Sequence, residues 1–332
     1  MFIPQVYIVA FALMILSMLC WGSWANSFKL CKKWRFELFY WDYVWGLVLV
    51  SLILGLTLGH TDPASADSFF RNLASAGTLN LAYAFLAGII FNVANILLVA
   101  AIEVAGLAVA FPIGIGLALV IGSVLNYVVT PKGNPLFLFG GIALVCVAIV
   151  FDALAYRKLS ADMKVTKKGI VLSLLSGVGI GLFYPFIAKA IVGENHLGPY
   201  TVMFVFALGI LISTVPVNYI FMRRPVTGAA PVVMAAYFAG PGIVHLWGIL
   251  GGLVWGVGTT ANFVASYAQM VGPATSYALG QGATMVSALW GVFVWKEFRG
   301  AGPEARRFLA MMFVFFIVGL TCVALAPVMG QP

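Results

Sequence analysis

Amide and aromatic side chains occur inside the long apolar runs of this sequence. Asn92 and Asn95 are three residues apart, as are Trp21 and Trp24, so each pair would share one face of a helix. An amide donates and accepts hydrogen bonds, and an aromatic ring offers a flat surface to a sugar ring or a planar heterocycle. The candidate solute-binding residues are Trp21, Trp24, Asn92, Asn95, Tyr184, Trp255, Asn262, Tyr277 and Gln281.

Simpler roles for the same residues stay open. Amides in membrane helices also hydrogen-bond to neighbouring helices, and tryptophan and tyrosine often anchor a helix at the membrane surface. A binding cavity is favoured because several amides and rings lie at similar depths in different runs.

Glu103 is the acidic residue that we place within a span, near the cytoplasmic end of the helix formed by the third apolar run. Because a carboxyl group inside a membrane is a candidate for taking up and releasing protons, Glu103 is predicted as the proton-coupling residue. The alternative is a hydrated position in the turn that follows the run. Asp42 and Asp152 lie near the ends of their runs and are expected to pair with basic loops.

Other kinds of chemistry have no support in the sequence. The four cysteines form no CxxC pair, and the three histidines are far apart, so neither a metal nor a disulfide framework is expected. A Walker A lysine motif is absent, which excludes ATP hydrolysis by this chain alone. We therefore expect no enzyme and no cofactor, and a proton gradient as the energy source.

Composition indicates an all-α integral membrane protein. Hydrophobic residues make up 63% of the 332 residues and charged residues 8%, whereas soluble domains carry about 25% charged residues. The net charge of +8 arises from basic residues between apolar runs. The lipid bilayer, rather than a nucleic acid, is the expected partner.

Ten apolar runs are each long enough to cross a membrane as a helix. They are continuous rather than alternating, which argues against a β-barrel. The first run lacks the basic start of a cleaved signal and is interpreted as a span. The runs are 5–28, 40–59, 80–101, 106–129, 136–156, 168–191, 200–222, 243–268, 272–295 and 307–328.

The basic residues are concentrated on one side of this topology. Fifteen of the 18 lysines and arginines lie in four connections, those after the first, fifth, seventh and ninth runs. Basic loops stay in the cytoplasm, so both termini are predicted outside, in the inner membrane of a bacterium.

The two halves of the chain look related. Gly106, Gly114 and Gly116 each have a glycine 166 positions later, and Ala108, Val120 and Val128 recur at the same offset. Five spans per half would make the second half upside down relative to the first, a 5+5 inverted repeat. The predicted units are 1–158, a cytoplasmic linker 159–166, and 167–332. The alternative is chance, since Gly and Ala recur in many membrane helices.

Three stretches carry a resemblance to a known family: KLCKKWRFELFYWDYVWG, AGIIFNVANILLVAAIEVAGLAVAFPIGIGLALVIGSVLNY and VWKEFRGAG. The chain resembles the drug/metabolite transporter superfamily, in the branch of glucose/ribose permeases, rhamnose–proton symporters and plant ureide permeases. The resemblance implies the ten-helix inverted-repeat fold and secondary transport of a neutral polar solute. The plant ureide permeases have a longer central loop than this chain.

The expected function is proton-coupled uptake of a small polar solute, with a monosaccharide as the leading substrate, by alternating access. A permease for ureides, nucleobases or nucleosides is the first alternative. An exporter of drugs or amino acids and a receptor or scaffold that transports nothing are the others. The expected partners are the small-molecule substrate, the bilayer and a second copy of the chain in a homodimer.

Overall fold

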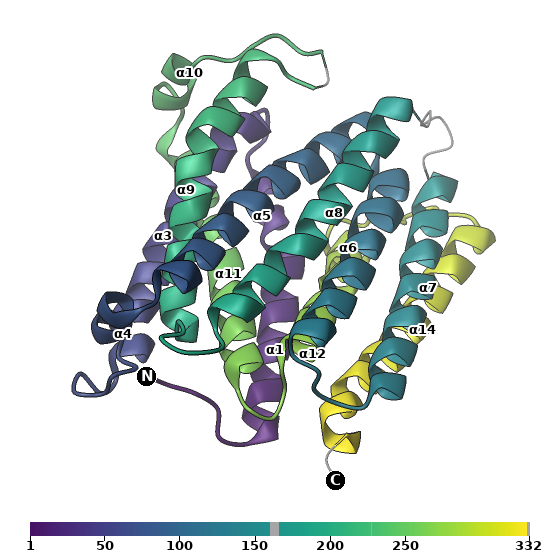
Figure 1. The fold of residues 1–332 in the computed structure, drawn as a ribbon. Helices are drawn as coiled ribbons and strands as arrows, with labels where there is room; N and C mark the ends of the chain where they lie inside the picture. The colour runs from purple at the N-terminus through teal and green to yellow at the C-terminus, as the bar shows by residue number, and fades with distance from the viewer. Residues whose placement is uncertain (160–165, 227, 331–332) are drawn as a thin grey trace.

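The computed structural model describes residues 1–159, 166–226 and 228–330, and these residues form a bundle of helices (Figure 1). Within these residues, ten helical stretches are long and apolar enough to cross a membrane, which confirms the predicted helical spans. The single-helix spans are α3 (Phe36–Leu56), α5 (Thr78–Ala105), α6 (Leu107–Val129), α7 (Pro135–Leu159), α8 (Lys167–Ala190), α9 (Pro199–Arg223), α11 (Gly242–Tyr267) and α14 (Pro303–Met329).

Two spans are built from shorter pieces. The first combines α1 (Tyr7–Ser23) with α2 (Ala25–Leu30), and the ninth combines α12 (Pro273–Gly280), α13 (Ala283–Leu289) and a wide π-helical turn at Trp290–Val294. Three short helices lie between spans: a 3-10 turn at Leu58–His60, α4 (Phe69–Ser75) and α10 (Met234–Phe238).

The bundle has two distinct ends. Both chain termini lie at one end, which we call the terminal face, and α10 lies at the other (Figure 1). The loops 31–35, 224–241 and 295–302 connect spans at the α10 end and carry lysines and arginines, so we call this end the basic face.

Glycines allow four of the spans to cross at backbone contact. Gly46 of α3 lies where this helix crosses α11, close to Gly252. A Cβ on Gly252 would lie 1.9 Å from a carbonyl oxygen of α3. Gly88 of α5 and Gly209 of α9 cross in the same way, with a Cβ on Gly88 2.1 Å from a carbonyl oxygen of α9. The missing side chains let the two backbones approach closely at each crossing.

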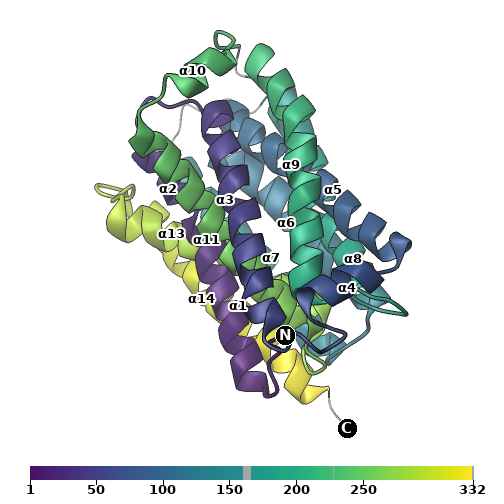
Figure 2. The same ribbon diagram turned by 90° about the vertical axis from the view of Figure 1, so that its left-hand side faces the viewer.

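The packing partners of the first five spans resemble those of the last five. Helix α5 packs on α8 and α9, while α11 packs on α1 and α3. Helix α6 packs on α8, while α13 packs on α1. Helices α7 and α14 pair at one side of the bundle (Figure 1), and the opposite side, with α3 and α9, faces the viewer in Figure 2. Gly106 before α6 and Gly272 before α12 also adopt the same conformation, with φ of 75° and 83°, a region that side chains disfavour. Each of them makes a tight turn between consecutive spans.

Candidate solute-binding cavity

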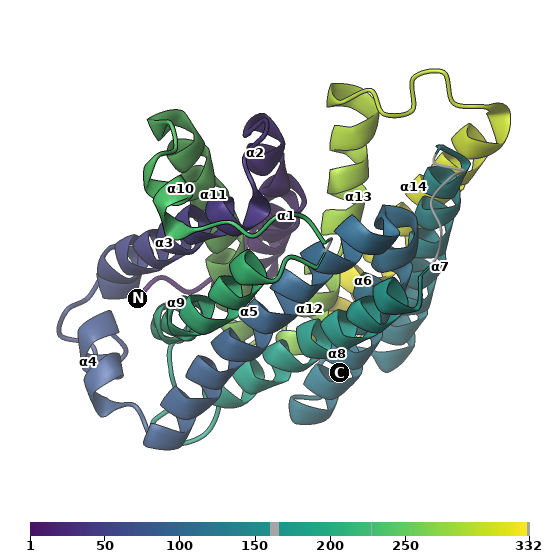
Figure 3. The same cartoon turned by 90° about the horizontal axis from the view of Figure 1, so that it is seen from above.

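A cavity of about 440 Å³ lies between α1, α2, α5, α8, α11 and α13. Viewed from the basic face, these helices surround the middle of the bundle (Figure 3). The cavity wall includes Lys29, Tyr156, Trp295 and Glu297, which are residues of helix ends and loops at that face. The volume is within the range of small-molecule sites.

The inner end of the cavity is aromatic. Trp21 and Trp255 are nearly parallel, with ring centroids 6.1 Å apart, and Phe91 lies against Trp255 at 4.6 Å. The indole Nε1 of Trp21 donates to Thr259 Oγ1 at 2.8 Å, which fixes the ring orientation. Three helices, α1, α5 and α11, thus supply flat apolar surfaces to one space.

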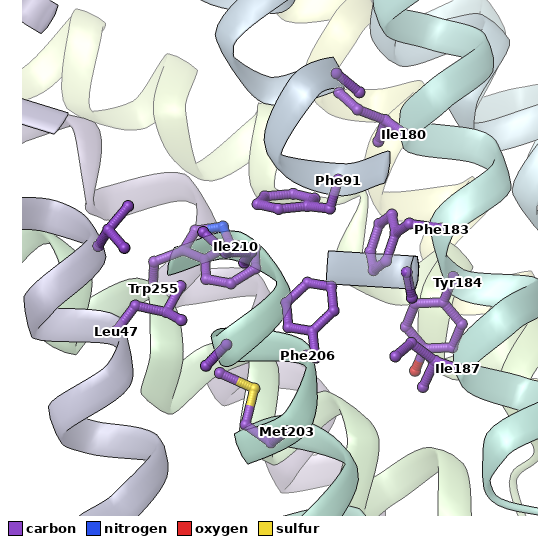
Figure 4. Packing of buried hydrophobic residues seen from close by; sticks show 14 of the residues in the cluster. Leu47, Phe91, Ile180, Phe183, Tyr184, Ile187, Met203, Phe206, Ile210 and Trp255 are labelled. Atoms are coloured by element: carbon purple, nitrogen blue, oxygen red, sulfur yellow. The ribbon is translucent and has the colours of Figure 1, made fainter. Parts of the chain in front are cut away.

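Below these rings the bundle is closed by a buried hydrophobic cluster. Figure 4 shows Phe206 and Met203 packed beneath Phe91 and Trp255, with Tyr184 beside them. Phe206, Met203 and Tyr184 are fully buried. The cluster separates the cavity from the terminal face, so in this conformation the cavity is reached from the basic face.

Polar groups are few along the wall and converge near the aromatic end. Gln281 lines the cavity, and no hydrogen bond of its side chain is found within the described residues. The Asn95 amide donates to Tyr40 Oη at 3.2 Å and keeps its carbonyl oxygen available. Thr284 and Ser287 add hydroxyl groups on α13. An apolar site with a few polar groups suits a neutral solute better than an ion.

At the mouth of the cavity the two halves of the chain are joined by an ion pair. Lys29 of α2 pairs with Glu297, whose carboxylate also accepts a hydrogen bond from Tyr156 Oη at 2.9 Å. The chain folds back after the π-helical turn, and Glu297 N donates to Gly291 O at 2.9 Å. A side chain at Gly291 would collide with the Glu297 carboxylate.

Sequence reasoning did not single out Lys29, Tyr156 or Glu297 as site residues. Glu297 follows the ninth run and was expected in a loop, and nothing in the residue pattern indicates that the loop returns to the cavity. Its place in the stretch VWKEFRGAG, which carried the family resemblance, was the available signal.

The predicted site residues divide into two groups in the structure. Six line the cavity: Trp21, Trp24, Asn95, Glu103, Trp255 and Gln281. Glu103 lies near the basic face and is exposed, in the wall of the mouth.

The other four predicted residues lie between helices, outside the cavity wall. Asn92 is fully buried, accepts a hydrogen bond from Tyr40 Oη at 2.8 Å and donates to Ser213 Oγ at 2.9 Å. Their contacts are those of interhelical hydrogen bonding, the simpler role that the sequence left open. The remaining three are Tyr184, Asn262 and Tyr277. The Tyr184 hydroxyl donates a hydrogen bond to Asn262 at 2.5 Å, and the Tyr277 hydroxyl donates one to Ala118 O at 3.1 Å.

Neither aspartate that was expected to pair with a basic loop does so among the described residues, and Lys164 of the loop after α7 lies outside them. Asp42 accepts hydrogen bonds from Tyr237 Oη at 2.6 Å and pairs with His245 Nδ1 at 2.9 Å. Burial and the Asp42 carboxylate raise the pKa of Tyr237, which therefore stays a donor that ties α10 to α3. Asp152 is buried without an ion pair among the described residues. The loop cations are exposed at the surface, where water already solvates them.

Comparison of the sequence with known proteins assigns the chain to a family. The family model described as "Sugar transport protein" matches residues 46–326. Ureide permease 1 of Arabidopsis thaliana is 24% identical over 379 residues, covering 94% of this chain and 95% of the relative. Ureide permease 2 of the same plant is 24% identical, with 93% and 94% covered. Transmembrane protein 144 homolog B of Dictyostelium discoideum is 26% identical over 48% of this chain and 40% of its own.

The family model covers α5, α8, α11 and α13 of the helices that enclose the cavity, and the match to ureide permease 1 covers nearly the whole chain; together they confirm the resemblance found in the sequence. The chain belongs to the sugar transport protein family and is a multi-pass membrane transporter of small solutes.

Proposed function

We propose that the protein is a secondary active transporter that takes up a small neutral polar solute together with a proton. The observation that carries the proposal is the cavity, in which the parallel rings of Trp21 and Trp255 adjoin the amides of Asn95 and Gln281. Aromatic faces pack against the apolar face of a sugar ring, and amides bond to its hydroxyl groups. A monosaccharide is accordingly the leading substrate.

A ureide or nucleobase is the second candidate, and a different observation favours it. Two of the relatives that match nearly the whole chain are named ureide permeases. A planar ring with amide edges would stack on a flat indole surface and pair with both the donor and the acceptor of Gln281.

Alternating access is the proposed mechanism, and the packing of the two halves supports an inverted repeat. The crossing at Gly88 and Gly209 has the same construction as the crossing at Gly252 and Gly46, with carbonyl oxygens in corresponding places. Since α5 corresponds to α11 and α9 to α3, the pairs are related by an offset of 163 or 164 positions, close to the offset of 166 in the sequence match. Rocking of such halves would close the cavity at one face and open it at the other.

If the basic face is cytoplasmic, as the charge distribution predicts, this conformation faces inward. Glu103 at the mouth is then open to cytoplasmic water. An exposed carboxylate is hydrated in its ionised form, so a coupling role for Glu103 requires that the mouth close around it. The variant Glu103→Gln tests that role.

Uptake into proteoliposomes tests the proposed function. Purified protein would be reconstituted and supplied with labelled D-glucose, D-ribose, L-rhamnose, allantoin or uracil, with and without an inward proton gradient. Saturable accumulation of one solute that depends on the gradient is expected. Saturable flux that is independent of the proton gradient would contradict proton coupling. Absence of saturable flux for all of these solutes would contradict the proposed substrate class.

A further inference from the structure

Asp152 is a buried carboxyl group that the transport site described above does not use. It lies in the last turns of α7, is 5% exposed, and its Oδ1 is shielded from solvent with no hydrogen-bond partner in the described parts of the chain. An ionised carboxylate in such a place is energetically costly unless it is paired. Such groups usually become neutral by binding a proton, and within membranes they usually serve a function.

The surroundings of Asp152 connect it to the mouth of the cavity. Tyr156 follows one helical turn later, lines the cavity and donates its hydroxyl to Glu297. The carboxyl groups of Asp152 and Glu297 are close enough to repel each other when both are ionised. Glu297 has a counter-ion in Lys29, whereas Asp152 has none among the described residues.

The other charges near this end of α7 are engaged elsewhere or exposed. Lys158 of α7 pairs with Glu304 of α14, and Arg157 is exposed. On α14, Arg306 and Arg307 are also exposed, and α6 has no ionisable side chain near the basic face. None of these groups supplies the charge that an ionised Asp152 would need.

We propose that Asp152 and Glu297 form the proton-binding pair of the transporter, with the proton held by Asp152 in the conformation described here. The inference rests on the proposed function and assigns its coupling site. Two neighbouring carboxylates with one counter-ion favour one bound proton. Lys29 neutralises Glu297, so the proton belongs on the unpaired member.

The proton balance of the step is simple. The mouth is open in this conformation, but Asp152 is buried behind Tyr156, which lines the cavity. When a water molecule of the cavity reaches Asp152, the O–H bond of Asp152 breaks and the proton passes to that water, which leaves a carboxylate. Reprotonation takes a proton from water on the opposite side once the cavity faces that way. A buried, ionised Asp152 is costly, so the transporter changes conformation slowly when Asp152 has lost its proton. This coupling of the conformational change to the bound proton is the requirement for symport.

A proton fits this pair better than a sodium ion does. Sodium needs several oxygen ligands around one point, whereas the Lys29 ammonium lies against Glu297 and Tyr156 donates its hydroxyl proton toward the same carboxylate. Donors directed at a site repel a cation. Glu103 is a weaker candidate because it is exposed.

Infrared spectroscopy of the purified chain tests the assignment without any solute, because the proton itself is the ligand. Difference spectra between acidic and alkaline pH should contain a carboxylic C=O band of a buried acid. We expect this band to be lost in Asp152→Asn and kept in Glu304→Gln, the matched control at the same end of the bundle. In Glu297→Gln the band should disappear at a lower pH than in the wild type, because the repelling charge is gone.

Transport provides the second measurement. Asp152→Asn proteoliposomes should lose proton-driven accumulation of the solute that the wild type accumulates, yet keep exchange of labelled for unlabelled solute. A variant that exchanges solute is folded, so its loss of accumulation supports the assignment. Asp152→Glu should restore accumulation, and Glu304→Gln, outside the cavity, should retain it.

The outcomes separate the two proposals. If Asp152→Asn keeps both the band and proton-driven accumulation, the assignment is overturned while the proposed function stands. Accumulation driven by a sodium gradient alone also overturns it. If the wild type itself shows no proton-driven accumulation, the proposed function fails, and the infrared band still decides whether Asp152 takes up a proton.

Discussion

At the scale of single residues, two amides that look alike in the sequence have different surroundings. Gln281 lines the cavity with no hydrogen bond of its side chain within the described residues, whereas Asn92 joins α5 to α3 and α9 through Tyr40 and Ser213. The first can bond to a solute, and the second already has protein partners. The same substitution should therefore affect transport at Gln281 and stability at Asn92.

We expect Gln281→Leu to weaken transport and leave the protein stable. Loss of a hydrogen bond worth about 1.4 kcal/mol would raise the KM for uptake about tenfold. Asn92→Leu should instead lower the free energy of unfolding in detergent by about 2 kcal/mol, because the buried Tyr40 hydroxyl loses the acceptor of its hydrogen bond. Uptake kinetics and melting curves of both variants provide the comparison. Unchanged kinetics in Gln281→Leu would remove it from the site.

Residue identity and depth in the sequence selected amides and aromatics but could not tell which face of a helix each one occupies. Trp21 and Trp255 line the cavity, while Tyr184 and Tyr277 are fully buried below it. The difference depends on how the helices rotate against one another, and the apolar runs carry little amphipathic pattern because both lipid and protein are apolar neighbours.

At the scale of helices, the crossings of glycine surfaces are the feature that a single methyl group can disrupt. A Cβ at Gly252 would lie 1.9 Å from a carbonyl oxygen of α3, and nothing lies within 4 Å of the corresponding position at Gly140 of α7. Backbone atoms cannot move aside as a flexible side chain can.

We therefore expect Gly252→Ala to destabilise the protein by about 3 kcal/mol or to prevent its assembly. The matched substitution Gly140→Ala should be neutral or slightly stabilising, because alanine favours a helix. Size-exclusion profiles and melting temperatures in detergent measure the difference. Equal stability of the two variants would mean that α3 and α11 do not cross at Gly252.

The positions of the spans were predictable, while their breaks were not. Continuous apolar runs gave each crossing to within a few residues, as for 80–101 and the observed Thr78–Ala105. The division of 272–295 into α12, α13 and a π-helical turn had no signal in hydropathy, because the break depends on contacts with other spans. A Cβ on Gly280, for example, would lie 2.5 Å from the Trp21 ring.

At the scale of the whole molecule, the even number of spans places both termini at one face (Figure 1). The basic loops lie at the opposite face, which the charge distribution predicts to be cytoplasmic. Composition and run length were sufficient to predict this helical architecture. The cavity required three-dimensional contacts between spans as distant as α1 and α11.

We expect a reporter joined to the C-terminus to be outside the cytoplasm. Alkaline phosphatase fused after residue 332 should be active, and green fluorescent protein fused there should be dark. The same reporters placed after truncation at residue 226, in the loop before α10, should give the reverse result. Fluorescence of the C-terminal fusion would contradict the proposed orientation.

The sealed cluster beneath Trp255 also bears on how inhibitors should be sought. A membrane-impermeant compound presented at the terminal face meets packed Phe206, Met203 and Tyr184, not the pocket. Screens on intact cells would then favour molecules that capture the opposite conformation. Screens on vesicles that expose the basic face would identify a separate chemical series, which binds in the cavity and stabilises the conformation described here.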